Sequence, residues 1–198
     1  MPLTDIQICN MALGHIGHTK FLADLSERSN EANVVNNFYT QAVEMTLESY
    51  PWPEATKYVT LGLVEEDPND DWDYLYQYPS DCLYARRIVT TNGRVEPTPP
   101  PFITGYSESG RVIYTDEEDA VLEYTLRLED PALFRPTLGE AISWYLAFLI
   151  GPGLAKDQKL TQGCFQVWQA MTSRAQQRAG NEQQHSQEID SEAIRSRA

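Results

Sequence analysis

Apolar residues recur at helical spacing near both ends of the chain, whereas the middle alternates between apolar and polar positions. The helical spacing predicts helices over about residues 4–17, 29–50, 137–151 and 157–178. The alternation, broken by proline and glycine, predicts a β region over about residues 59–129. We therefore expect an α+β fold that is mainly a bundle of four helices, with an inserted small antiparallel β region and an extended C-terminal tail.

The helix ends are marked by capping residues and by helix breakers. Thr4 with Gln7, and Thr137 with Glu140, each match a capping box, so the first and third helices should begin there. The run Gly151–Gly153 contains Pro152 and should end the third helix. The second and fourth helices are expected to be capped by Ser29 and Asp157, and the fourth to turn Leu160, Cys164, Val167, Trp168 and Met171 inward.

Residues 72–90 are the most regular part of the middle region. Trp72, Tyr74, Tyr76 and Tyr78 recur with a period of two, which places four rings on one face of a strand. Pro79 then forces an extended corner. Residues 82–89 are rich in apolar and β-branched side chains and predict a second strand. The stretch is interpreted as two core strands joined by a proline corner.

Further strands are expected at residues 102–106, 111–115 and 120–129, with another turn at Asn92-Gly93. In the last strand, Leu122 and Tyr124 share one face, and Glu123 and Thr125 share the other. This alternation predicts a half-buried antiparallel strand.

Six acidic residues surround Pro68, between Glu65 and Asp73. A calcium site is one interpretation, but the spacing lacks the order of an EF-hand loop and its late glutamate. A solvated loop is therefore favoured. Residues 55–59 are expected to form one further short turn before the chain extends through Leu61 and Leu63.

The 198 residues fit one domain with a tail, and the formal charge of −14 opposes general binding to nucleic-acid phosphates. The longest apolar run, 141–155, is too short to span a bilayer, and no secretory leader is expected at the N-terminus. Cys9, Cys82 and Cys164 are expected to be buried free thiols. His15 and His18 are expected to be charged groups that favour a helix end, and we predict neither a metal site nor a cofactor.

Several segments carry a resemblance to a known family. The residues 8–17 resemble an opening helix, 110–124 a hairpin and 141–155 a long apolar helix, while Tyr39, Ala42, Leu47 and Trp52 resemble a second helix and its exit. A sequence signature is formed by Trp72, Tyr76, Pro79, Asp81, Cys82 and Leu83. Together, over about residues 4–175, they resemble the head-to-tail adaptor family of tailed bacteriophages, of the tail tubular protein A and packaged-DNA stabilization types.

The resemblance implies a structural virion protein at the head–tail junction, made in the cytoplasm of the bacterial host. About twelve copies would form a ring between the portal protein and the downstream tail or nozzle protein. Genomic DNA would pass through the acidic lumen without specific binding, and no membrane would be involved. Residues 1–180 would form the adaptor domain and 181–198 a polar tail that docks on the portal. The docking residues would be Gln183, Gln184, Ile189, Ile194, Arg195 and Arg197.

Two other functions are compatible with the sequence. A peptidoglycan-degrading (muralytic) virion enzyme would need two carboxylates across a cleft, but the acidic residues fall in expected turns, so no catalytic residue is predicted. No nucleophile, histidine and acid grouping of a hydrolase appears either. A non-viral oligomeric scaffold is the other alternative.

Overall fold

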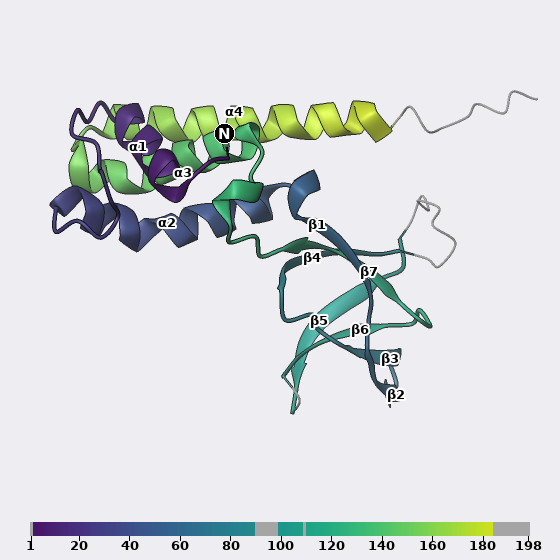
Figure 1. Cartoon of the computed structure of the whole chain (residues 1–198). Coiled ribbons are helices and arrows are strands. Elements are labelled where there is room, and N and C mark those ends of the chain that lie inside the picture. Colours follow the sequence, from purple (N-terminus) through teal and green to yellow (C-terminus); the bar gives the residue numbers. More distant parts are fainter. Residues whose placement is uncertain (1, 90–98, 109, 184–198) are drawn as a thin grey trace, which may run out of the picture.

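The computed structural model describes residues 2–89, 99–108 and 110–183, and it has two lobes (Figure 1). The helical lobe contains α1 (Asp5–His15), α2 (Asn30–Ser49), α3 (Pro136–Leu154) and α4 (Gln158–Gln183). The β lobe lies between α2 and α3 in sequence. Its strands are β1 (Thr56–Thr60), β2 (Leu63–Asn69), β3 (Trp72–Gln77), β4 (Cys82–Val89), β5 (Phe102–Ser107), β6 (Gly110–Thr115) and β7 (Val121–Leu126).

The expected fold class is wrong in its proportions. The chain is α+β with four helices, but its described strands form two antiparallel sheets instead of a small insertion in a bundle. One sheet has the order β1-β7-β4 and the other β2-β3-β6-β5. The strands enclose a hydrophobic core of their own, with Tyr76, Ile113 and Tyr124 at its centre. Because the β region buries its own apolar face, it makes up a full lobe of the molecule.

The first two helices begin where the capping residues predict. The Thr4 hydroxyl accepts a hydrogen bond from Gln7 N at 3.3 Å, and Gln7 Oε1 accepts one from Thr4 N at 3.0 Å. The Ser29 hydroxyl accepts one from Ala32 N at 3.2 Å. Each contact satisfies a backbone N–H that has no partner within its helix.

The third helix is longer at both ends than expected. It begins at Pro136, with Arg135 as N-cap, so the predicted cap at Thr137 is wrong. Proline at the first helical position is favoured because its φ is already helical and its missing N–H is not needed there. The helix also continues through Pro152 to Leu154, because Pro152 lies in the last turn and removes only one hydrogen bond.

The acidic stretch after Leu61 is a strand and not a loop. Residues 63–69 form β2, which pairs with β3 through a register that shifts at two places, and Asp67 has a φ of 49°. The carboxylates are exposed, as expected. Residues 53–55 form a short 3₁₀ turn and 56–60 form β1, so the turn expected at 55–59 is also wrong. The register shifts and charges of β2, which is an edge strand of its sheet, protect that edge from pairing with another chain.

The last strand, β7, is buried on both faces, since Leu122 and Tyr124 on one face and Glu123 and Thr125 on the other are all buried. Glu123, expected on a solvated face, is only 8% exposed and pairs with Arg87 Nε at 2.6 Å. The half-buried interpretation is therefore wrong. The strands at 82–89, 102–106 and 111–115 are confirmed, while Asn92-Gly93 lies outside the described residues.

The helical core is organised around α3, which packs against α1, α2 and α4. Gly151 allows a close approach to α4, since a Cβ there would lie 2.5 Å from Thr161 Oγ1. Cys164 is buried and Trp168 and Met171 pack on the core as expected. Leu160 and Val167 instead face outward, with 38% and 37% of their surface exposed.

Candidate functional site

The sequence signature begins in β3, within the β lobe, and ends at the start of β4, where the two lobes meet. Cys82 and Leu83 follow Pro79 at the start of β4, and neighbouring strand residues point to opposite faces. Cys82 enters the core of the β lobe, whereas Leu83 enters the core of the helical lobe. Tyr76 is 2% exposed, in the β core, and Trp72 is half-buried. The signature therefore joins two cores, and it forms no cleft with reactive groups.

Asp81 fixes the start of β4 within the β lobe, through its side chain and its backbone. One carboxylate oxygen lies 2.6 Å from Lys57 Nζ and the other accepts a hydrogen bond from the Tyr124 hydroxyl at 2.8 Å. The backbone oxygen of Asp81 accepts from Arg127 N at 2.9 Å. The hydrogen bond from Lys57 lowers the pKa of Asp81. Asp81 thus connects the start of β4 to β1 and β7.

Two arginines, from β4 and from the residues after β7, reach α2. The Arg86 guanidinium donates to the carbonyl oxygens of Leu47 and Glu48 at 3.0 and 2.8 Å and to Thr125 Oγ1 at 2.8 Å. Arg127 lies 3.2 Å from Glu44. Carbonyls in the last turn of a helix have no partner within the helix, so Arg86 caps α2 from the β lobe. Sequence reasoning missed this role, although two adjacent arginines inside an apolar strand were a signal for it.

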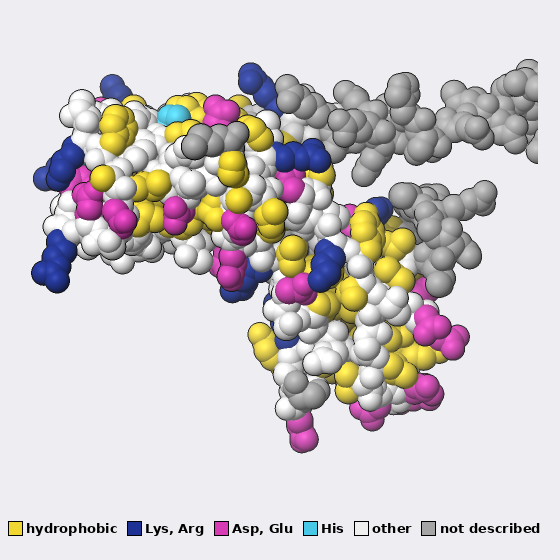
Figure 2. All heavy atoms as spheres, viewed as in Figure 1, with side chains coloured by type: hydrophobic (Ala, Val, Ile, Leu, Met, Phe, Trp, Pro, Cys, Tyr) yellow, Lys and Arg dark blue, Asp and Glu magenta, His cyan; other side chains and the backbone are white. Residues whose placement is uncertain are grey.

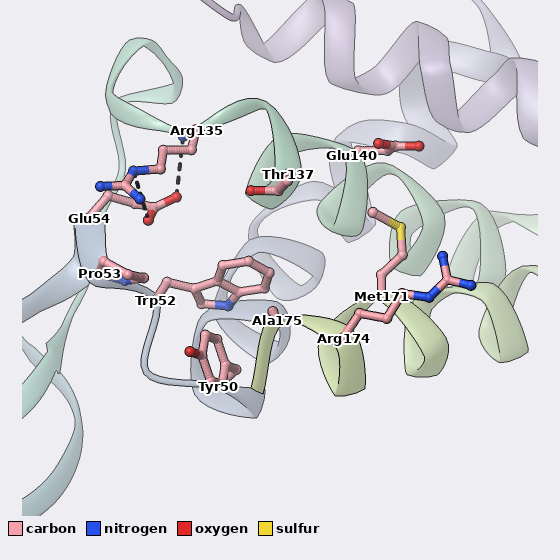
Figure 3. A pocket seen from close by; sticks show the side chains of 10 residues that line it. All are labelled: Tyr50, Trp52, Pro53, Glu54, Arg135, Thr137, Glu140, Met171, Arg174 and Ala175. Atoms are coloured by element: carbon pink, nitrogen blue, oxygen red, sulfur yellow. Dashed lines mark hydrogen bonds and ion pairs between the residues drawn. The ribbon is translucent and has the colours of Figure 1, made fainter. Parts of the chain in front are cut away.

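A pocket of about 450 Å³ opens beside this junction, between the exit of α2, the start of α3 and α4 (Figure 3). Trp52 is almost fully buried there and donates from its indole Nε1 to Thr46 O at 2.9 Å. Glu54 accepts a hydrogen bond from Arg135 N at 3.3 Å and lies 3.7 Å from its guanidinium Nε. Glu140 lines the same pocket, but its carboxylate points away from Glu54 (Figure 3). The pocket therefore does not present two facing carboxylates.

His15 is neutral and does not act as a charged group at the end of α1, contrary to expectation. Its ring stacks on Trp144 with centroids 3.5 Å apart, and burial lowers its pKa to about 4. Its Nε2 lies 3.0 Å from Ser143 Oγ, whose hydroxyl donates to Glu140 O at 2.7 Å. Nε2 is therefore the protonated nitrogen, and the ring ties α1 to α3.

The three cysteines are buried free thiols, as predicted. Burial raises the pKa of Cys9 to about 12, so this thiol is unreactive at neutral pH. Within residues 2–89, 99–108 and 110–183, no group of three His, Cys, Asp or Glu side chains is arranged to hold a metal ion.

The predicted docking tail falls almost entirely outside the described residues. Gln183 is the last residue of α4, while Gln184, Ile189, Ile194, Arg195 and Arg197 lie beyond the described part of the chain. None of the described helices has the length and hydropathy that a membrane crossing requires.

The comparison with known proteins gave no relative on which a function could be based. No protein-family model matches the chain, and no curated protein matches it.

Proposed function

We propose that this chain is a head-to-tail adaptor of a tailed bacteriophage, a structural virion protein that forms a ring between the portal and the tail. The observation that carries the proposal is the course of α4. This helix runs along α3 and then past the rest of the helical lobe (Figure 1). It carries the chain away from its own core and toward any partner that lies beyond.

The contacts of α4 define where this extension begins. Ala175 is the last residue whose described side chain packs against the helical core, and the helix continues to Gln183. The remaining turns cover about 12 Å at the helical rise per residue. The described end of α4 therefore lies beyond the core contacts, which suits a helix that reaches a separate protein.

The charge distribution supports a role beside DNA that slides. Asp and Glu side chains lie along the side of the β lobe that points away from the helical lobe (Figure 2). Asp73 in β3 and Asp116 after β6 are in contact, since Asp116 Oδ1 accepts a hydrogen bond from Asp73 N at 3.2 Å. In a ring of about twelve copies, such surfaces would repel the phosphates of passing DNA and limit friction.

Truncation after Gly180 tests the proposal. The shortened chain keeps every core contact up to Ala175, so its helix content and unfolding midpoint should match those of the full chain. We expect it to lose binding to purified portal rings in a pull-down. Unchanged binding would contradict docking through the tail.

Two substitution pairs separate the contributions within the tail. Ile189→Ser with Ile194→Ser removes apolar anchors, and Arg195→Ala with Arg197→Ala removes cations. Each pair should weaken portal binding, while Gln176→Ala, on the exposed part of α4, should leave it unchanged.

A further inference from the structure

Two separate apolar surfaces of the helical lobe are exposed. The first, here the α1 hollow, is a depression of about 740 Å³ whose apolar lining is Leu3, Met11, Gly14 and Phe21. Phe21 forms its rim and is 57% exposed. Figure 2 shows apolar side chains gathered on the face where α1 lies. The hollow is concave and could receive a side chain from another molecule.

The second surface, here the α4 ridge, is an exposed strip of α4 formed by Leu160 and Val167. These residues are two turns apart on the same side of α4, and both are exposed. Gly163 lies between them, and a Cβ there would meet no atom within 4 Å. Met171, one turn further along, lines the pocket that contains Trp52. The ridge therefore borders the α2 side of α4, and it cannot enter the α1 hollow of its own chain.

The charges beside the two surfaces are opposite. Exposed Lys156 and Lys159 stand at the start of the ridge, together with Asp157, whose carboxylate accepts hydrogen bonds from Lys159 N and Leu160 N. Asp5 lies at the start of α1, and Asp24 and Glu27 follow Phe21 in the next loop. The loop also holds two cations, of which Lys20 is paired with Glu31 at 3.4 Å and Arg28 is exposed. Carboxylates thus outnumber unpaired cations beside the hollow, whereas the two lysines outnumber the one carboxylate, Asp157, at the start of the ridge.

We propose that the α4 ridge of one copy packs into the α1 hollow of the next copy. This inference rests on the proposed ring, and it names the contact that would build it. A hollow and a ridge on different helices make a heterologous contact, in which each copy uses both surfaces with different neighbours. Such contacts close into a ring when the rotation between copies is suitable, whereas a two-fold contact would stop at a dimer. The paired charges set the direction of the contact.

Cysteine cross-linking of the full-length chain tests the contact. One batch carries Met11→Cys and a second carries Val167→Cys. The native thiols are buried and give little background. We expect a cross-linked dimer under mild oxidation when the two batches are mixed, and none from either batch alone. A chain with both substitutions should give a ladder of multimers.

The matched control replaces Val167→Cys by Gln166→Cys, which lies on the outer side of α4. This control should not cross-link to Met11→Cys. Cross-links within a single batch would show a two-fold contact and overturn the proposal, as would the absence of cross-links in the mixture.

Assembly on portal rings separates this inference from the proposed function. Chains that assemble there without the Met11–Val167 cross-link would overturn the contact alone. Chains that never assemble would overturn both the contact and the adaptor role. In addition, Val167→Asp should raise the concentration needed for assembly about tenfold or more, because it places a charge in the hollow.

Discussion

Arg86 of β4 donates a hydrogen bond to the carbonyl oxygen of Leu47 in the last turn of α2, at 3.0 Å. The same nitrogen donates to Glu48 O at 2.8 Å. The link connects residues from different lobes and satisfies a helix end that no residue of its own helix can reach. The orientation of the β lobe on the helical lobe is therefore held by polar contacts as well as by Leu83.

Replacement of Arg86 should destabilise the protein. For Arg86→Ala we expect the free energy of unfolding to fall by about 2–4 kcal/mol, because half-buried carbonyls lose a charged donor. Arg86→Lys should lose less, since it keeps the charge but not the planar fork. Urea unfolding measures the free energy of unfolding of both variants, and Arg28→Ala, at an exposed position, is the control. An Arg86→Ala variant as stable as the control would contradict the capping role.

Two glycines of the helical lobe form a matched pair. Gly151→Ala brings a methyl group against Thr161 and should cost about 1–3 kcal/mol by overpacking. Gly163→Ala meets open space in the middle of α4 and should raise stability by about 0.5–1 kcal/mol through helix propensity. Thermal unfolding of the two variants gives the comparison. Equal changes in stability would mean that the close approach of α3 and α4 at Gly151 does not cause the loss expected for Gly151→Ala.

His15 should make stability depend on pH. Its pKa falls from 6.5 to about 4 on folding, because the ring is desolvated. The unfolded chain therefore takes up a proton below pH 6.5 that the folded chain does not. Stability from the neutral ring is complete above pH 6.5 and is lost as the pH falls toward 4, by about 1 kcal/mol for a partly buried group.

His15→Gln removes this titration and keeps a hydrogen-bond donor near Ser143. The difference in unfolding free energy between the wild type and this variant should shrink as the pH falls from 6.5 to 4.5. A constant difference, or a ring that titrates near pH 6.5 by NMR, would refute the buried neutral state.

The purified protein should not bind duplex DNA. Its formal charge is −14, and the release of counterions that drives DNA binding needs clusters of cations. In a gel shift at low salt, where phosphate binding is strongest, the expected result is free DNA at micromolar protein. A retarded band there would contradict the repulsive lumen.

The sequence predicts local features of this fold better than the partners of each strand. The Thr4 capping box and the strand from Cys82 depend on nearby residues, and both are confirmed. The burial of Glu123 depends on its ion pair with Arg87 on the neighbouring strand β4. The periodicity of β7 alone does not reveal this partner. The size of the β lobe was missed for the same reason, since β2 is acidic and exposed and becomes a strand only through its pairing with β3.

The candidate site was predictable in part. The alternation from Trp72 to Tyr78 and the proline corner are visible in the sequence, and Cys82 and Leu83 after that corner enter the cores of the two lobes. The stacking of His15 on Trp144 joins residues far apart in the chain, so spacing within α1 gave no sign of it.

The central claim is that the chain assembles side by side on a portal. Light scattering coupled to size-exclusion chromatography, on the full chain alone and mixed with purified portal rings, tests this claim most directly. The adaptor account predicts a complex in which many copies, about one per portal subunit, elute with the portal. A protein that stays monomeric and elutes apart from the portal at every concentration would contradict it.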